Sequence, residues 1–271
     1  MMEAMRISIV KLGGSVITNK SEIEEINEEN IRSLMKQLTK SNSHIVLIHG
    51  AGSFGHPIAK KYGLIDGDPD PTVEKLLAVC RTHHKVQILN SELIRIGNEE
   101  GLPLFPLAPS AFVTETKEGE YDYSRTIVNN VVKQGFIPVL YGDMILSHSR
   151  SFTVLSGDVT MHKIAFVLQK YGFDVKHVVY VSDVNGLYTN DPKLDPNAEM
   201  IEDVAAEEFD SYLELASGSS STDVTKGMYG KLLEIKEFVK RGINVSIVNA
   251  EGKHLQNCLD GLNYIGTTFR A

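Results

Sequence analysis

The chain has 271 residues, with 27 lysines and arginines against 35 aspartates and glutamates, so its formal net charge is −8. This balance leaves no broad basic surface, and we expect no nucleic-acid partner. The two cysteines lack CxxC spacing, and neither a signal peptide nor an apolar run of about 18 residues occurs. The sequence thus predicts a reduced, cytoplasmic protein without a membrane segment, folded as one unit over 1–271.

A strand, a glycine turn, a helix and a second strand open the chain. Residues 7–10 are apolar and β-branched, and residues 11–15 form a glycine-rich turn. Asn27 is a typical helix N-cap, and the apolar spacing after it predicts a helix that returns the chain to a strand at 45–48. Two strands joined in this way form a right-handed βαβ unit.

The remaining elements continue this alternation of strands and helices. We expect, in chain order, a short helix at 57–62, a long helix at 72–100, a strand at 102–107, a hairpin at 111–123, a helix at 125–134, a strand at 137–141, short strands at 144–146 and 152–155, a helix at 158–171 with Asp158 as its candidate N-cap, a strand at 177–181, helices at 205–215 and 231–241, a strand at 245–248, a short helix near 255 and a last strand at 267–269.

The long helix at 72–100 carries an apolar stripe that we expect to be buried. His83 and His84 also lie in this helix, and we expect both on its surface because no third residue stands at metal-ligand spacing. The predicted stripe comprises Leu76, Leu77, Val79, Cys80, Val86, Leu89, Leu93 and Ile96.

Alternating strands and helices predict an α/β fold with a mostly parallel sheet and helices on both faces. In such sheets, ligands bind beyond the carboxyl ends of the strands. The glycine-rich stretch 49–56 directly follows a predicted strand and carries His49 and His56. Such a turn can bring backbone N–H groups close to a phosphate, although it can also serve only as a connection.

Three lysines, Lys11, Lys20 and Lys231, stand in or beside glycine turns. Cations in such positions can stabilise the spread negative charge of a phosphoryl group in transfer. The chain has no Walker motif and no protein-kinase motif set, so those site types are not expected. Ser53 fits the Gly-x-Ser-x-Gly pattern of nucleophilic serines only in part, because Ala51 replaces the first glycine.

Several short motifs in this order resemble those of the amino-acid kinase superfamily, and 49–56 resembles the form found in isopentenyl phosphate kinases. The match extends from Lys11 to residue 267. The motifs are KLGGS at 11–15, the glycine turn at 49–56, YGD at 141–143, SGD at 156–158, SDVNGLY at 182–188 and DVTKGM at 223–228 with Lys231 beyond it.

The resemblance implies a three-layer αβα sandwich in which roughly 1–155 bind the phosphate acceptor and 156–271 bind ATP. It implies that Lys11 and Lys231 hold the transferring phosphoryl group, that Lys20 stabilises its charge and that Asp158 orients the lysines. His56 occupies the position that the family uses to hydrogen-bond the acceptor phosphate, and an imidazole can donate to a phosphate in either protonation state.

The same resemblance implies two sets of binding residues and a homodimer. It also implies that Mg²⁺ binds together with ATP and neutralises its phosphates, and we assign no side chain as a metal ligand. Val159 replaces a second acid that relatives often carry, and Lys226 replaces a glycine. The ATP side would comprise Lys11, Gly13, Gly14, Ser15, Gly52, Asp158, Asp183, Gly186, Gly227 and Lys231, and the acceptor side Ala51, Gly52, His56, Gly142 and Asp143.

The activity that the resemblance implies is ATP-dependent phosphorylation of isopentenyl phosphate to isopentenyl diphosphate. Two alternatives stay open at this point. One is a kinase for glutamate, acetylglutamate, aspartate or UMP, and the other is a nucleotide-binding protein of the same fold without catalysis. The length of alkyl chain that is accepted depends on which residues of the helix at 72–100 close the pocket.

Overall fold

The computed structural model describes residues 5–19, 24–192, 194–218 and 223–271. Its strands are β1 Arg6–Leu12, β2 His44–His49, β3 Leu104–Pro106, β4 Val113–Lys117, β5 Glu120–Tyr123, β6 Ile137–Tyr141, β7 Asp143–Ser147, β8 Ser151–Leu155, β9 Asp174–Ser182, β10 Leu187–Tyr188, β11 Met200–Ile201, β12 Asp203–Val204, β13 Asn244–Asn249 and β14 Gly266–Phe269. Its α-helices are α1 Gly14–Ile17, α2 Glu28–Lys40, α3 Gly52–Lys61, α4 Val73–Glu99, α5 Arg125–Lys133, α6 Gly157–Lys170, α7 Phe209–Gly218, α8 Asp223–Val239 and α9 His254–Leu259, with 3₁₀ turns at Pro109–Ala111 and Ala206–Glu208.

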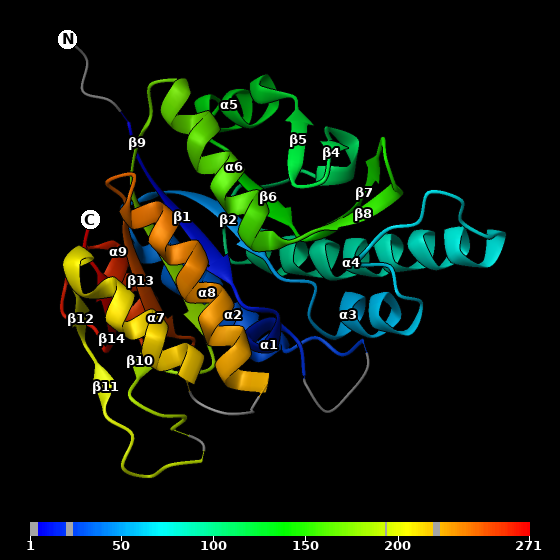
Figure 1. Ribbon diagram of the computed structural model, residues 1–271. Helices are drawn as coiled ribbons and strands as arrows, with labels where there is room; N and C mark the ends of the chain where they lie inside the picture. The colour runs from blue at the N-terminus through cyan, green and yellow to red at the C-terminus, as the bar shows by residue number, and fades with distance from the viewer. Residues whose placement is uncertain (1–4, 20–23, 193, 219–222) are drawn as a thin grey trace.

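The main sheet has eight strands in the order β12-β14-β13-β9-β1-β2-β6-β3. All neighbours are parallel except β13 and β14. Figure 1 shows α6 and α8 in front of this sheet and α2 behind it. The α/β class and the mostly parallel sheet that the sequence predicts are therefore confirmed.

A separate hydrophobic core fills each side of the main sheet. Side chains such as Ile164 of α6 and Phe238 of α8 pack on one face. Leu34 of α2 and Leu93 of α4 belong to the core on the other face. Because residues at successive strand positions point to opposite faces, buried strands supply both cores and are apolar throughout.

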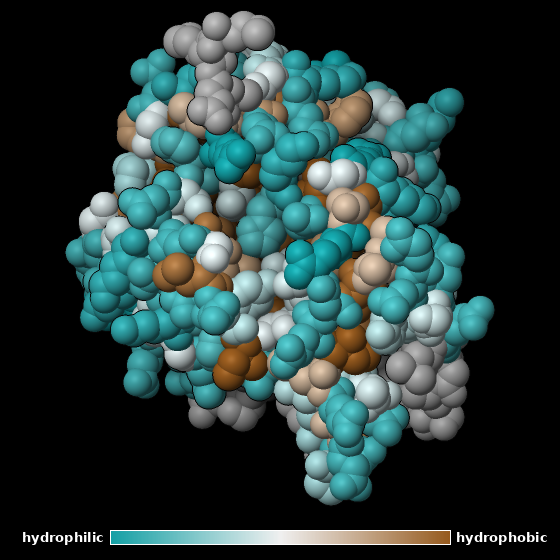
Figure 2. All heavy atoms as spheres, turned by 90° about the vertical axis from the view of Figure 1, so that its left-hand side faces the viewer, coloured by the Kyte–Doolittle hydropathy of each residue, from teal (hydrophilic) through white to brown (hydrophobic). Residues whose placement is uncertain are grey.

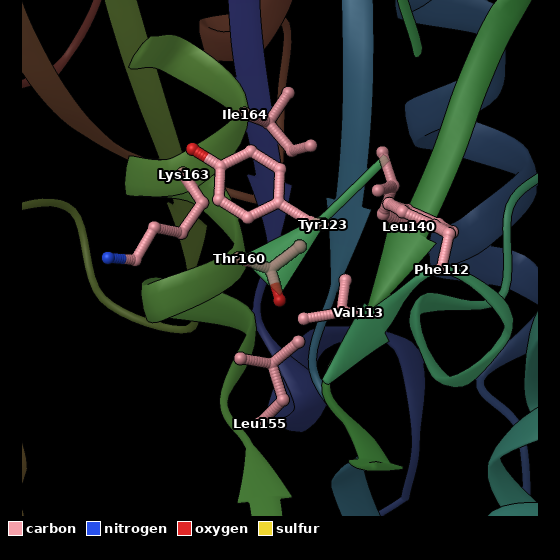
Figure 3. Close-up of a pocket in the computed structure, with 8 residues that line it drawn as sticks. All are labelled: Phe112, Val113, Tyr123, Leu140, Leu155, Thr160, Lys163 and Ile164. Atoms are coloured by element: carbon pink, nitrogen blue, oxygen red, sulfur yellow. The ribbon is translucent and has the colours of Figure 1, made fainter. Parts of the chain in front are cut away.

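A smaller four-stranded sheet, ordered β5-β4-β7-β8, includes the expected hairpin and both short strands. Between it and α6 lies a small apolar pocket, whose lining Figure 3 shows. Lys163 borders this pocket, but its ammonium group points away from the other side chains in Figure 3 and lies over the ring of Tyr121 at 5.4 Å. The pocket offers no group of convergent polar side chains for chemistry.

Most predicted boundaries agree with the structure to within a few residues, but two helices begin earlier than expected. Helix α3 begins at Gly52 because the carbonyl of Ala51 accepts hydrogen bonds from the N–H groups of Phe54 and Gly55. The glycine stretch is thus mostly helix, with Pro57 inside it. Helix α8 begins at Asp223, before the predicted start at 231, and includes Gly227 and Gly230.

The buried face of α4 differs from the prediction in its first half. Leu76 and Leu77 are 44% and 48% exposed, and Cys80 is exposed as well. Ala78 and Thr82 are buried there instead. The second half of the predicted stripe, from Val86 to Ile96, is buried as expected. Leu89, Leu93 and Ile96 of this half pack in the same core as Leu34 of α2.

The molecular surface is mostly hydrophilic on the side that carries β12, β14 and α9. Figure 2 shows this side, with hydrophobic side chains in small separate groups. In the described ranges, no helix has the length and apolar character needed to span a membrane.

A buried ion pair fixes the small sheet. The carboxylate of Glu115 on β4 has no exposed side-chain area, and Nη2 of Arg150 lies 2.6 Å from its Oε1. The hydroxyl of Ser147 donates to the other oxygen at 2.6 Å. Arg150 also donates to the carbonyl of Asp66, so the pair joins β4, the turn between β7 and β8, and the loop after α3.

We predict that Arg150→Ala lowers the free energy of unfolding by about 3 kcal/mol, because it leaves the buried Glu115 carboxylate without its partner. Urea denaturation measures this change. The double variant Glu115→Gln/Arg150→Ala serves as the control and should recover part of the loss. An Arg150→Ala protein as stable as the wild type would contradict the assignment.

Candidate active site

The candidate site lies at the carboxyl ends of the central strands, in a cavity of about 210 Å³. Its walls come from the turn after β1, the start of α3, the junction of β6 and β7, and the first turn of α6. Helix α4 forms the remaining side. Segments far apart in the sequence therefore meet at one edge of the sheet, as expected for a ligand site in a parallel sheet.

Lys11 and Asp158 form the ionic centre of the cavity. The Lys11 ammonium donates to Oδ1 of Asp158, and only 12% of the lysine side chain is exposed. Lys231 is close by, because the ammonium groups of Lys11 and Lys231 lie 5.6 Å and 5.9 Å from the centre of the same ring, that of Tyr180. Two cations and one carboxylate thus gather where a phosphoryl group would need charge stabilisation.

The surroundings of Lys231 weaken its hold on its proton. Burial lowers its pKa, the Lys11 cation lowers it further, and Asp158 and Asp183 oppose part of this change, which leaves a pKa of about 8. Lys231 is therefore mostly protonated at neutral pH but loses its charge in mildly alkaline solution.

Two backbone segments approach each other closely beside Lys11. A Cβ atom on Gly14 would lie 2.7 Å from the backbone of Gly52, and one on Gly50 would lie 2.9 Å from the Gly14 nitrogen. Gly52 also has a φ of +51°, in the left-handed region. Glycine at these places lets the turn after β1 pack against the start of α3.

The two histidines of the glycine stretch differ in their surroundings. His49 is fully buried, its Nε2 lies 3.2 Å from Oδ1 of Asn90 on α4, and its ring stacks on Tyr141. His56 lines the cavity from α3 and is exposed at its mouth, where partial desolvation by the surrounding atoms and then the Lys11 cation lower its pKa. Its imidazole is therefore neutral at pH 7 and can still donate one N–H to a ligand.

His83 is half-buried and contacts Asp143, a residue of the cavity lining, which the expectation of a plain surface residue did not include, whereas His84 is exposed as expected. Nδ1 of His83 lies 2.6 Å from Oδ1 of Asp143, whose side chain is fully buried. Asp143 also accepts from the backbone N–H groups of Ser110 and Met144. The hydrogen bond to Asp143 raises the pKa of His83, and burial opposes this effect.

Asp158 does not cap α6, in contrast to the prediction. The side chain of Ser156 accepts from the N–H of Val159 and is the N-cap. Asp158 stands one residue inside the helix, in the first turn. This position still favours a carboxylate, because the N-terminal end of a helix carries partial positive charge. It also leaves the side chain free to contact Lys11.

Of the residues expected to bind ligands, eight line the cavity: Lys11, Gly13, Gly14, Ala51, His56, Gly142, Asp143 and Asp158. Ser15 and Gly52 lie next to it, in α1 and α3, without lining it. Gly186 is packed against Thr267, beyond the end of β9, and Gly227 belongs to α8. Lys20 lies outside the described residues, as does the side chain of Lys226.

The sequence interpretation did not name several lining residues as ligand-binding. Gly50, Gly55, Ser156 and Gly157 lie within motifs that it noted, and the others are mostly apolar and belong to no motif. Thr82 and Val86 of α4 are one turn apart and face the cavity together, so a helical-spacing argument centred on these positions could have found them. The full missed set is Gly50, Gly55, Ala59, Thr82, Val86, Met144, Val154, Leu155, Ser156 and Gly157.

Comparison with known proteins supports a common origin over nearly the whole chain. The model of the amino acid kinase family matches residues 6–249. The isopentenyl phosphate kinase of Methanothermobacter thermautotrophicus is 33% identical, over 89% of this chain and 90% of the relative. A glutamate 5-kinase of Caldanaerobacter subterraneus subsp. tengcongensis is 24% identical, over 98% of this chain and 68% of the relative.

Solved structures agree with this result. The crystal structure of an isopentenyl phosphate kinase substrate complex superposes with a TM-score of 0.78 at 26% identity, covering 97% of this chain and 100% of the other. The chain therefore belongs to the amino acid kinase family.

Proposed function

We propose that this protein transfers the γ-phosphoryl group of ATP to isopentenyl phosphate and forms isopentenyl diphosphate. The observation that carries the proposal is the mixed lining of the cavity. Lys11 and His56 supply polar groups that can bind a phosphate, and Ala59, Val86 and Met144 supply apolar walls. An acceptor with a phosphate head and a short hydrocarbon tail matches both kinds of lining. The relatives named isopentenyl phosphate kinases support the same acceptor.

The chemistry would proceed by positioning and charge stabilisation. Lys11 and Lys231 would contact the oxygens of the γ-phosphoryl group as negative charge spreads over them. Asp158 would hold Lys11 in place through their ion pair. His56 would donate a hydrogen bond to the acceptor phosphate, whose oxygen attacks in line, and Lys20 would add a further cation.

ATP would occupy the side of the site formed by 156–271, and the acceptor the side formed by roughly 1–155. The described residues contain no group of three or more histidine, cysteine or acidic side chains suited to a metal ion. Mg²⁺ would therefore be bound mainly through the phosphates of ATP, as is usual for this ion. A cytoplasmic location stays a prediction.

A coupled assay of ADP release across acceptors tests the proposal. Isopentenyl phosphate should support turnover, whereas glutamate, acetylglutamate, aspartate and UMP should not. The described lining of the cavity contains no arginine that could form a bidentate pair of hydrogen bonds with a carboxylate, which favours the phosphate acceptor. Preferred turnover of a carboxylate would overturn the proposal, and ATP binding without any transfer would favour the non-catalytic alternative.

His56→Ala should lower kcat/KM for isopentenyl phosphate by roughly 100-fold, because it removes a hydrogen bond to a charged phosphate. His56→Gln keeps an N–H donor and should retain more activity. Steady-state kinetics with varied acceptor measure both effects. An unchanged kcat/KM in His56→Ala would remove this residue from acceptor recognition.

We predict that kcat/KM for ATP falls as the pH rises through about 8, the pKa of Lys231. The sign follows from the charge: the protonated ammonium holds phosphate oxygens, and the neutral amine formed above the pKa does not. Lys231→Arg should be less active but should lose this alkaline decline, because a guanidinium stays charged. A decline that persists in Lys231→Arg would assign it to another group.

A homodimer is part of the proposal, and the edge of the main sheet supports it. Strand β3 ends the sheet, and Phe105 and Phe136 beside it are 39% and 44% exposed, with ring centres 5.4 Å apart. Exposed aromatic pairs are typical of protein interfaces.

The double variant Phe105→Ser/Phe136→Ser should shift the protein from dimer to monomer in light scattering after gel filtration. Leu146→Ser changes an exposed apolar residue on β7 and should leave the dimer intact. A monomeric wild-type chain would contradict the proposal.

A further inference from the structure

The ring of Tyr180 on β9 lies close to the ammonium groups of both lysines of the site. Its residue is only 2% exposed, and the ammonium groups of Lys11 and Lys231 lie 5.6 Å and 5.9 Å from its ring centre. Both distances are within the range of cation–π attraction. The sequence interpretation gave this tyrosine no function.

The sheet register explains how one ring reaches two cations. Strands β1 and β9 are parallel neighbours, and Lys11 is paired directly with Tyr180. Paired residues on adjacent strands point to the same face of a sheet. That face is the one covered by α6 and α8, which contribute Asp158 and Lys231. Tyr180 therefore lies beside the charged groups of Lys11 on β1, Asp158 on α6 and Lys231 on α8.

The tyrosine hydroxyl is not what holds the ring in place. It is buried, and it has no hydrogen-bond partner within the part of the chain that the structure describes. Burial, together with the negative charges of Asp158 and Glu234, raises the pKa of Tyr180 well above its usual value, so the ring stays neutral. An unpaired buried hydroxyl costs stability. The aromatic face is then the feature of this side chain that can benefit the site.

We infer that Tyr180 is a positioning residue, whose ring holds the ammonium groups of Lys11 and Lys231 together in their charged forms for phosphoryl transfer. Two cations repel each other, and the attraction of each to the electron-rich aromatic ring offsets part of that repulsion. Asp158 and Asp183 act on Lys231 in the same direction. The inference rests on the proposed transfer from ATP, but it also predicts a property of the free protein.

Three variants separate the ring from the hydroxyl and from the apolar volume. Tyr180→Phe keeps the ring, whereas Tyr180→Leu and Tyr180→Met keep an apolar side chain without a ring. Phe269→Leu removes a buried aromatic ring from the same core, on β14, and serves as a matched control for lost packing.

Tyr180→Phe should keep kcat within about twofold of the wild type and should melt at the same or a higher temperature, because it loses only an unpaired hydroxyl. Tyr180→Leu and Tyr180→Met should lower kcat by roughly tenfold. In both, the alkaline decline of kcat/KM for ATP should move to lower pH by about half a unit or more, because the Lys231 ammonium loses its attraction to the aromatic ring. Phe269→Leu should lose stability without moving this decline.

NMR titration of protein labelled at the lysine ε-carbon measures the same effect without any substrate, with the Lys231 signal assigned by Lys231→Arg. The Lys231 pKa should fall in the variants without a ring and stay constant in Tyr180→Phe. An unchanged pKa, or one that rises because water enters, would overturn the inference. If the wild-type protein transfers no phosphoryl group to isopentenyl phosphate, the proposed function fails, while this titration still decides the placement of the lysines by Tyr180.

Discussion

The ion pair between Lys11 and Asp158 is the contact on which the site depends. It joins the end of β1 to the first turn of α6, two segments that are 147 residues apart in the chain. It also places a cation and a carboxylate at the boundary between the acceptor half and the nucleotide half that we propose. A phosphoryl group in transfer must cross such a boundary, so the charge that stabilises it has to be held from both sides.

The rest of the fold keeps this contact in place and shapes the space beside it. Close packing of Gly14 against Gly52 fixes the turn after β1 relative to α3. Two hydrogen bonds hold helix α4 against the sheets. Asn90 contacts His49 at the end of β2, and His83 contacts Asp143 at the start of β7. Beside these contacts, α4 presents Thr82 and Val86 to the cavity. A hydrocarbon tail would then lie against a wall whose position is set by hydrogen bonds.

Local patterns allowed much of this arrangement to be predicted from the sequence. The alternation of strands and helices, the glycine turns and the motif that carries Asp158 all depend on residues close together in the sequence. The structure places the glycine turns and Asp158 at one cavity. The contacts of His83 and Tyr180 could not be predicted in this way. His83 meets Asp143 across 60 residues, and Tyr180 meets Lys11 only through the register of two strands. The predicted start of α8 at 231 is also wrong, since the helix begins at Asp223 and includes two glycines, whose cost of about 1 kcal/mol each tertiary context can override.

The most direct test of the account is to identify the bond that forms. Phosphorus NMR of the protein with ATP, Mg²⁺ and isopentenyl phosphate should show the acceptor's single phosphate signal replaced by two mutually coupled signals of an alkyl diphosphate, as ATP becomes ADP. Release of inorganic phosphate from ATP with the acceptor signal unchanged would contradict the central claim that this site joins a phosphoryl group to a phosphate acceptor.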